Sequence, residues 1–240
     1  MDVLNVIVLR SFMFGDTKMM VDVLSREEGR LSCVCKIGSS KIGRGRRQMF
    51  QPLSLLEIVV ERKQAGRLPV VKDVHISVPF SGIPFDAYKL SVSMFLAEFL
   101  VCVTKSERDV ALLYEYVRDS VLWLDGVKSG FANFHLVFMI RLSRFVGFYP
   151  NLDDFHDGCC FDMSNGCFVE SHVSGRGFLN EEESRKMYLL MRMDYSTMHL
   201  FSMSRVERNR CLDVVLEFYR LHVPDFGELK SLAVLRELFV

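Results

Sequence analysis

The sequence lacks the segments and motifs that mark several large classes of protein. Its longer apolar stretches are interrupted by Glu98, or by Arg141 and Arg144, before they reach the ~18 residues that a membrane-spanning helix needs. It has no Gly-x-Ser-x-Gly elbow, no P-loop and no His-Glu-x-x-His segment, and Gly43-Arg44-Gly45 lacks the third glycine of a dinucleotide site. We therefore expect no membrane partner, no cofactor and no enzymatic activity.

The cysteines do not suggest a disulfide framework. They are odd in number and scattered along the chain, at positions Cys33, Cys35, Cys102, Cys159, Cys160, Cys167 and Cys211. Such a distribution favours reduced thiols in a reducing compartment. The apolar run at residues 3–9 follows an acid and ends at Arg10 without a small-residue cleavage site, unlike a signal peptide. We therefore expect a cytoplasmic protein.

The net charge of zero conceals an uneven distribution. Residues 1–80 contain 13 Lys/Arg and 8 Asp/Glu, which gives +5 and leaves −5 for residues 81–240. The densest positive segment is KIGSSKIGRGRR at residues 36–47, where no acid separates Lys36, Lys41, Arg44, Arg46 and Arg47. Its Gly and Ser content predicts a flexible loop that binds phosphates, although a solvated loop that only aids solubility has the same composition.

Period-two alternation and turn residues predict five short strands in the first third of the chain, at residues 3–10, 19–25, 31–37, 53–62 and 70–78. Five antiparallel strands of this length favour a small closed barrel, and the OB-fold is the simplest choice. OB-folds bind single-stranded nucleic acid on a curved face and its loops. We therefore predict an OB-fold domain over residues 1–80.

Other residues near the predicted strands are candidates for the same site. Four cations flank the strands and extend the basic path: Arg10, Lys18, Arg26 and Arg30. Three aromatic residues have two interpretations: Phe12, Phe14 and Phe50. Exposed rings would stack on bases. Because most of the 20 phenylalanines must lie in the core, we expect all three to be buried.

After Pro84 the apolar period changes to three and four residues, which predicts helices at residues 86–104, 107–124 and 131–147. Two capping patterns, Asn180 with Glu183 and Ser204 with Glu207, predict further helices, and a short one ends the chain. Residues 151–178 are rich in Gly, Asp and Ser and predict an irregular insert or a small hairpin. The predicted class is α+β, with an OB-fold barrel followed by an all-helical domain over residues 81–240 that contains this insert.

Several short motifs follow one another at specific spacings. The first are a Gly15-Asp16 turn, an apolar strand at residues 21–24, a hairpin at 25–30 and the basic segment at 36–41. The later ones are Gln51-Pro52-Leu53, LAEFL at 96–100, a Phe-x-x-x-Leu-x-x-x-x-Gly-x-x-Pro pattern at 138–150 and LKSL at 229–232. Together they resemble the bacterial recombination mediator family RecO over the whole chain.

The resemblance implies a non-catalytic role in DNA repair. Members of this family bind single- and double-stranded DNA, anneal complementary strands, and work with RecR to load RecA onto strands covered by single-stranded-DNA-binding protein, so the expected location is the nucleoid. The remaining alternative is a protein-interaction scaffold, in which the basic segment docks an acidic partner and DNA contact is incidental.

A second site is expected for the C-terminal tail of the single-stranded-DNA-binding protein. Because that tail is acidic and apolar, its receptor needs an apolar groove edged by cations. The candidate residues lie on the predicted helix at 131–147 and on a later helix: Phe138, Arg141, Arg144, Phe145, Arg205, Arg208 and Arg210.

The sequence departs from the family at the zinc site that many members have. Two of the thiolates would fall at Phe155 and Gly158, and adjacent cysteines do not easily reach one metal. The donors that remain nearby are Cys159, Cys160, Cys167, His156 and His172. We expect no metal, with packing of Phe155, Phe161 and Phe168 in its place. The neighbouring acids are expected to form a solvated loop: Asp153, Asp154, Asp157 and Asp162.

Overall fold

The computed structural model describes residues 1–38, 41–62, 66–104, 110–170 and 177–238. The chain divides into two compact units, Met1–Gly126 and Val127–Val240. No helix within the described ranges is long and apolar enough to cross a membrane.

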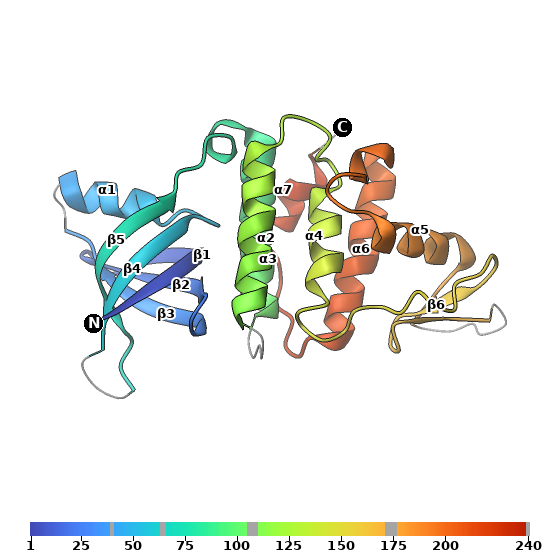
Figure 1. Ribbon diagram of the computed structural model, residues 1–240, viewed down its shortest axis with the longest axis horizontal. Coiled ribbons are helices and arrows are strands. Elements are labelled where there is room, and N and C mark those ends of the chain that lie inside the picture. Colours follow the sequence, from blue (N-terminus) through green and yellow to red (C-terminus); the bar gives the residue numbers. More distant parts are fainter. Residues whose placement is uncertain (39–40, 63–65, 105–109, 171–176, 239–240) are drawn as a thin grey trace. The chain divides into compact units, whose positions relative to one another are not determined.

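The first unit contains a closed five-stranded barrel (Figure 1). Its strands are β1 (Asp2–Phe14), β2 (Lys18–Ser25), β3 (Gly29–Lys36), β4 (Leu55–Glu61) and β5 (Val70–Val78). They close in the order β1-β2-β3-β5-β4, and all pairs are antiparallel except β3 with β5. This topology confirms the OB-fold prediction. β1 and β2 extend further than the pattern indicated, so their hairpin is longer.

The barrel interior is filled by alternate residues of each strand. Val6, Val8, Val21, Val23 and Cys33 are fully buried there. Both ends of the connection between β3 and β4 are anchored in the same core, by Ile37 and Phe50. Burial raises the pKa of the Cys33 thiol to about 12, so this cysteine stays protonated and packs as a small apolar residue.

The basic segment is not the flexible loop that the sequence predicted. Its second half is a helix, α1 (Lys41–Met49), which lies between β3 and β4. Two contacts favour the helix in spite of its glycines: a Cβ on Gly43 would lie 1.9 Å from the Gly38 carbonyl oxygen, and Arg46 donates to the Lys72 carbonyl. The Gly43 backbone lies close to the Gly38 backbone, and Met49 and Phe50 pack against the barrel core. These tertiary contacts outweigh the low helix propensity of glycine.

Helices α2 (Ala87–Val103) and α3 (Val110–Gly126) belong to the same unit as the barrel and contact β1, β2 and β3. Asp86 caps α2 as predicted, by accepting from the N–H groups of Tyr88 and Lys89. The short helix η1 (Ile83–Phe85) precedes α2. Asp125 at the end of α3 accepts hydrogen bonds from the N–H groups of residues 81–83, at 2.7–2.9 Å. The expected start of α3 at Glu107 lies outside the described residues.

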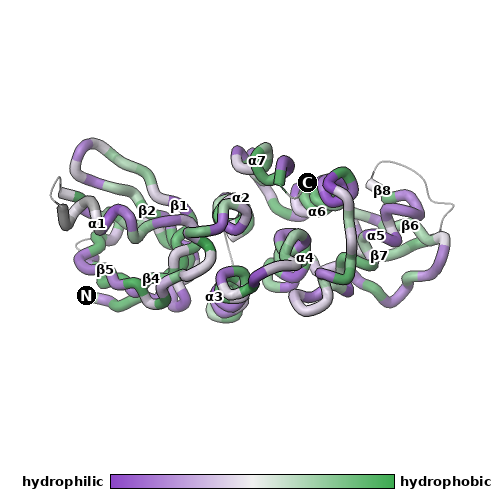
Figure 2. The backbone as a smooth tube through the Cα atoms, turned by 90° about the horizontal axis from the view of Figure 1, so that it is seen from above, coloured by the Kyte–Doolittle hydropathy of each residue, from purple (hydrophilic) through white to green (hydrophobic). Residues whose placement is uncertain are grey.

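The second unit is mainly helical. It contains α4 (Phe134–Leu142), α5 (Glu181–Arg192), η2 (Met198–Leu200), α6 (Arg205–His222) and α7 (Leu232–Arg236). α4 is hydrophobic along most of its length (Figure 2) and almost every residue of it is buried, so it is the core helix of this unit. The predicted caps are present, since Asn180 accepts from the Glu183 N–H group and Ser204 forms a reciprocal capping box with Glu207.

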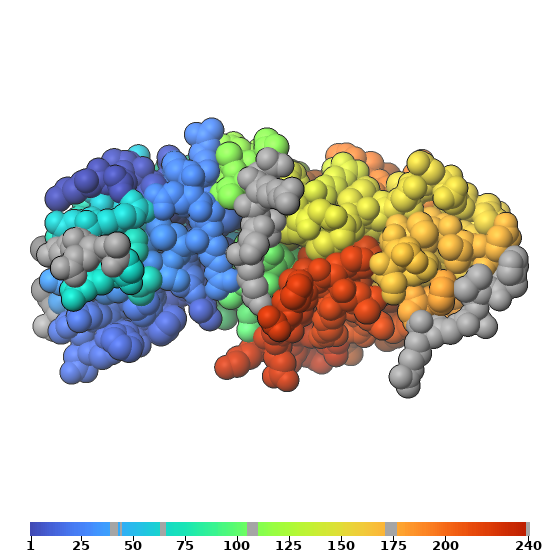
Figure 3. Space-filling model, turned by 90° about the horizontal axis from the view of Figure 1, so that it is seen from below, coloured from blue at the N-terminus to red at the C-terminus, as the bar shows by residue number. Residues whose placement is uncertain are grey.

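The insert between α4 and α5 forms a small sheet of β6 (Cys160–Asp162), β7 (Cys167–Val169) and β8 (Phe178–Leu179). β6 and β7 make the hairpin that was one of the two expected forms. The insert lies beside α6 (Figure 3), and the Phe161 ring contacts the ring of Phe218 with centroids 6.0 Å apart. The acidic residues are not all solvated as expected: Asp162 is buried and accepts from Ser164 and Asn165.

Candidate nucleic-acid interface

The outer face of β1, β2 and β3 presents side chains in rows. Strand pairing places residues that lie opposite one another on the same face. The three rows nearest the β1–β2 turn contain one residue from each strand: Arg10–Asp22–Ser32, Phe12–Met20–Val34 and Phe14–Lys18–Lys36. The residues between these rows point into the barrel core. The face therefore combines an apolar row with flanking charged rows.

Two of the three candidate aromatic residues are on this outer face. The exposed fraction is 48% for Phe12 and 63% for Phe14, whereas Phe50 is buried at 1%. The expectation of burial is correct for Phe50 and wrong for the other two. Both rings lie on the part of β1 that extends beyond the predicted end of the strand at residue 10, and there they are on the outer face and not in the core.

Lys18 and Lys36 are opposite one another on adjacent strands, beside Phe14. Both are exposed, and neither has an ion pair within the described part of the chain. Two like charges in register repel each other, because cross-strand partners are only about 5 Å apart at Cβ. A pair of this kind is stabilised by an anion from outside the protein.

Arg10 is held in place by an acid beneath it. Its Nε donates to Asp22 Oδ2 at 2.5 Å, and its guanidinium carbon lies 5.8 Å from the centre of the Phe12 ring. Asp22 also accepts from the Ser32 hydroxyl at 2.6 Å. About half of the Arg10 side chain, 54%, remains exposed. Arg10 thus borders the apolar row on the side away from the β1–β2 turn.

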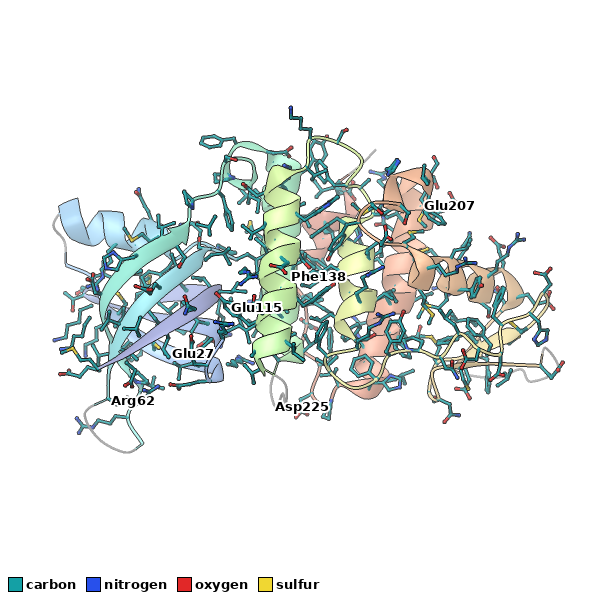
Figure 4. All side chains as sticks on the ribbon, in the orientation of Figure 1. Glu27, Arg62, Glu115, Phe138, Glu207 and Asp225 are labelled. Atoms are coloured by element: carbon teal, nitrogen blue, oxygen red, sulfur yellow. The ribbon has the colours of Figure 1, made fainter. Side chains whose placement is uncertain are left out.

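Arg26 and Arg30 lie at the opposite end of the strands and contact the helices of the same unit. Arg26 pairs at 2.8 Å with Glu115, which Figure 4 labels on α3, and Arg30 donates to the Val101 carbonyl of α2 at 2.7 Å. Through these contacts both arginines stabilise the packing of α2 and α3 on the barrel. Arg26 and Arg30 therefore do not lie beside Lys18 and Lys36.

The arginines of α1 add to the positive charge of the barrel. Arg47 is exposed and has no ion pair within the described ranges, while Arg46 is half-buried and donates to the Lys72 carbonyl. The backbone of Lys41 and Arg44 lies in the first half of α1, and their side chains fall outside the described part of the structure. Among the described side chains of α1, Arg47 is therefore the exposed cation without an ion pair, and Arg46 is held against β5.

The connection between β4 and β5 reaches the same face, which the sequence did not indicate. The Val34 N–H group donates to the Pro69 carbonyl at 2.9 Å, so this connection borders β3 at the apolar row. Leu68 and Arg67 precede Pro69, and both are exposed. In OB-folds this connection and the β1–β2 turn flank the ligand-binding face. Once the OB-fold was predicted, this rule could have identified Arg67 and Leu68 as candidate site residues.

The residues expected to hold an acidic peptide are in the second unit, where most have internal partners. Phe138 is fully buried within α4 (Figure 4) and lines no surface. Arg141 donates to the Met193 carbonyl, and Arg208 is buried and donates to Asn133 and to the Met203 carbonyl. The outer members have surface partners: Arg144 with Tyr149, Arg205 with Glu237 and Arg210 with Glu183. Phe145 is half-buried.

The donors at the degenerate zinc position do not fit a metal site. No group of three His, Cys, Asp or Glu within the described residues is arranged to hold a metal ion, and His172 lies outside those residues. Aromatic contacts take this place. The Phe155 ring stacks on Tyr188 with centroids 3.7 Å apart, and Phe168 contacts both Phe155 and Phe161 at 5.0–5.1 Å. The three phenylalanines are thus packed together, as predicted.

Comparison with known protein families matches both halves of the chain. A family described as "Recombination protein O N terminal" matches residues 1–80, and one described as "Recombination protein O C terminal" matches residues 84–233. The protein named "DNA repair protein RecO" from Phocaeicola vulgatus is 46% identical over 97% of both chains. Proteins of the same name from Bacteroides fragilis and Flavobacterium johnsoniae are 44% and 31% identical, again over 97% of both chains. The chain therefore belongs to the RecO family of DNA repair proteins.

Proposed function

We propose that this protein is a non-catalytic recombination mediator that binds DNA on the outer face of its barrel. The observation that carries the proposal is the row Phe14–Lys18–Lys36, which is exposed and lies at the tip of the β1–β2 hairpin. With Arg47 of α1 it offers three cations that have no acidic partner within the described residues. Bound phosphates would relieve their repulsion.

The binding energy of such a face comes from counterion release. Each phosphate that a lysine or arginine neutralises frees condensed cations from the DNA. The slope of log affinity against log salt then becomes more negative by about 0.7 for single strands and about 0.9 for duplex. The proposal includes both single- and double-stranded DNA, because this contribution does not depend on the bases. Neutralised phosphates also repel a complementary strand less, which supports strand annealing.

The finer steps of the mediator role are part of the same proposal. We infer that the protein acts with RecR and helps load RecA onto strands coated by single-stranded-DNA-binding protein, at the nucleoid. The support is family membership and the barrel face. The acidic-apolar tail of the coating protein would contact the second unit, where Arg144, Arg205 and Arg210 remain partly exposed. Arg141, Arg208 and Phe138 have positions inside the unit and would act only as support.

A salt titration with a fluorescent oligonucleotide tests the proposal. We expect strong binding of a bare oligonucleotide at low salt that falls steeply as salt rises, together with faster annealing of complementary strands. Absence of binding at low salt would overturn the proposal and favour the protein-scaffold alternative.

A further inference from the structure

The outer face carries an apolar row that phosphate binding does not explain. Phe12, Met20 and Val34 lie side by side on β1, β2 and β3. Phe12 is about half exposed and the other two are half-buried. Phe14, in the next row along β1, is also exposed, and the exposed Leu68 precedes Pro69, whose carbonyl accepts from the Val34 N–H group. Single exposed apolar residues need no explanation, but a continuous row within a charged surface does.

Cations border this row on both sides. Lys18 and Lys36 lie in the row toward the hairpin tip, and Arg10 lies in the row away from it. The acids near the face are Asp22, whose carboxylate already binds Arg10 and Ser32, and Asp16 in the β1–β2 turn. The surroundings therefore suit a ligand with flat apolar parts and a negatively charged chain, which is the chemistry of an unpaired nucleic-acid strand.

The spacing of the two phenylalanines fits bases that are separated from one another. Residues i and i+2 of a strand point to the same face about 6.7 Å apart. Successive base pairs of a duplex are about 3.4 Å apart, so their faces are covered by their neighbours. A phenyl ring reaches a base face only where the strand is unpaired and stretched, so that each ring meets one base.

We propose that Phe12 and Phe14 stack on bases of a single strand and thereby make this site select unpaired DNA over duplex. The inference rests on the proposed function, since it concerns the same face. The cations supply affinity for any phosphate chain, whereas the two rings supply the preference for a strand whose bases are accessible. Met20 and Val34 extend the apolar surface beneath the bases.

The test compares the double variant Phe12→Ala/Phe14→Ala with the wild-type protein on a single-stranded oligonucleotide and on a hairpin duplex. Loss of one stacked base weakens binding by about 5- to 150-fold. We expect at least an about fivefold loss of affinity for the single strand, less than a twofold change for the duplex, and an unchanged salt slope for both. Phe85→Ala, at an 85% exposed phenylalanine outside this face, is the matched control and should leave all values unchanged.

An abasic oligonucleotide supplies the reciprocal change, because it keeps every phosphate and lacks the bases. The wild-type protein should bind it as weakly as the Phe12→Ala/Phe14→Ala protein binds the normal strand. The double variant should not distinguish the two oligonucleotides. This comparison identifies the base as the partner of the rings.

A spectroscopic signal checks the contact directly. The chain has one tryptophan, Trp123, so Phe14→Trp introduces a second indole whose emission can be followed against that of the wild-type protein. Stacking predicts that the single strand quenches the added emission while the duplex does not, and that affinity is retained because indole also stacks.

The outcomes separate the two proposals. If the wild-type protein binds oligonucleotide with the expected salt slope, yet the folded double variant has the same preference for single strands, the stacking inference is wrong and the proposed function stands. If the wild-type protein binds neither strand form, the proposed function fails and the inference fails with it.

Discussion

Arg10 Nε donates to Asp22 Oδ2 at 2.5 Å on the outer face of the barrel, and the Asp22 side chain is only 4% exposed while that of Arg10 is 54% exposed. The acid therefore lies beneath the arginine and fixes its direction. Arg30 Nη2 approaches the same carboxylate oxygen at 3.8 Å. Asp22 is thus a buried negative charge beneath the proposed DNA-binding face, and it holds side chains of that face together.

Replacing Asp22 with asparagine should strengthen DNA binding and weaken the fold. The change removes a buried negative charge below the proposed phosphate positions and releases Arg10. An exposed cation such as Arg10 changes affinity for a phosphate by up to about fivefold. Loss of the charged hydrogen bonds to Arg10 and Ser32 should lower the free energy of unfolding by about 1–3 kcal/mol. Oligonucleotide titration and urea denaturation measure the two effects.

Ser32→Ala is the control for Asp22→Asn, because it removes one hydrogen bond to the carboxylate and leaves all charges in place. It should lower stability slightly and leave DNA affinity unchanged. Equal or weaker DNA binding by Asp22→Asn would contradict the assignment of phosphates to this face.

Asp125 should make the first unit sensitive to acid. Burial raises the pKa of this carboxyl, but the N–H groups of Ile83, Ser81 and Gly82 outweigh burial and hold its pKa below the usual value. A carboxyl of this kind stabilises the fold above its unfolded-state pKa of about 3.9 and loses that contribution as pH falls through the lower folded pKa. The free energy of unfolding should therefore decrease as pH falls below about 4.

Asp125→Asn should reduce stability at neutral pH and flatten this acid dependence, as measured by urea denaturation at several pH values. Asp119→Asn, at an exposed carboxylate of the same helix, is the control and should behave as the wild-type protein. An Asp125→Asn protein with unchanged stability and pH dependence would show that the contact between α3 and the segment before α2 contributes little.

The insert should be stable without metal. Because Phe155 stacks on Tyr188 and contacts Phe168, a chelator should leave the melting temperature unchanged. Tyr188→Ala should lower stability, since an aromatic pair contributes about 0.5–1.5 kcal/mol beyond its buried area. Tyr188→Phe keeps the ring and serves as the control. Stoichiometric zinc in the purified protein, or a chelator-dependent melting temperature, would contradict this assignment.

The sequence predicted the barrel because its strands alternate clearly, with Val6, Val8, Val21 and Val23 directed to the core. It did not predict α1, because two glycines among cations give no helical period. The contacts that form this helix, such as the approach of Gly43 to the Gly38 backbone, are tertiary. At the basic segment the local sequence pattern therefore predicts a loop, whereas tertiary packing produces a helix.

The candidate site was predictable only in part. Lys18 and Lys36 were predicted as site residues from their charge. The exposure of Phe12 and Phe14 was not predicted, because residues 12–14 are all apolar and give no alternation. Arg26 was grouped with the cations, since the sequence does not reveal that α3 places Glu115 beside it. Burial and pairing by distant elements decide which charges and rings remain available.

The most direct test of the account is the salt dependence of single-strand binding by a protein with Lys18, Lys36, Arg46 and Arg47 all changed to alanine. The matched control removes four exposed cations of the second unit: Lys128, Arg185, Arg192 and Arg220. If all four barrel cations contact phosphates, the slope of log affinity against log salt should flatten by up to about 2.8, and annealing should slow. The control should keep the wild-type slope. Equal slopes for the folded barrel variant and the wild-type protein would contradict the account.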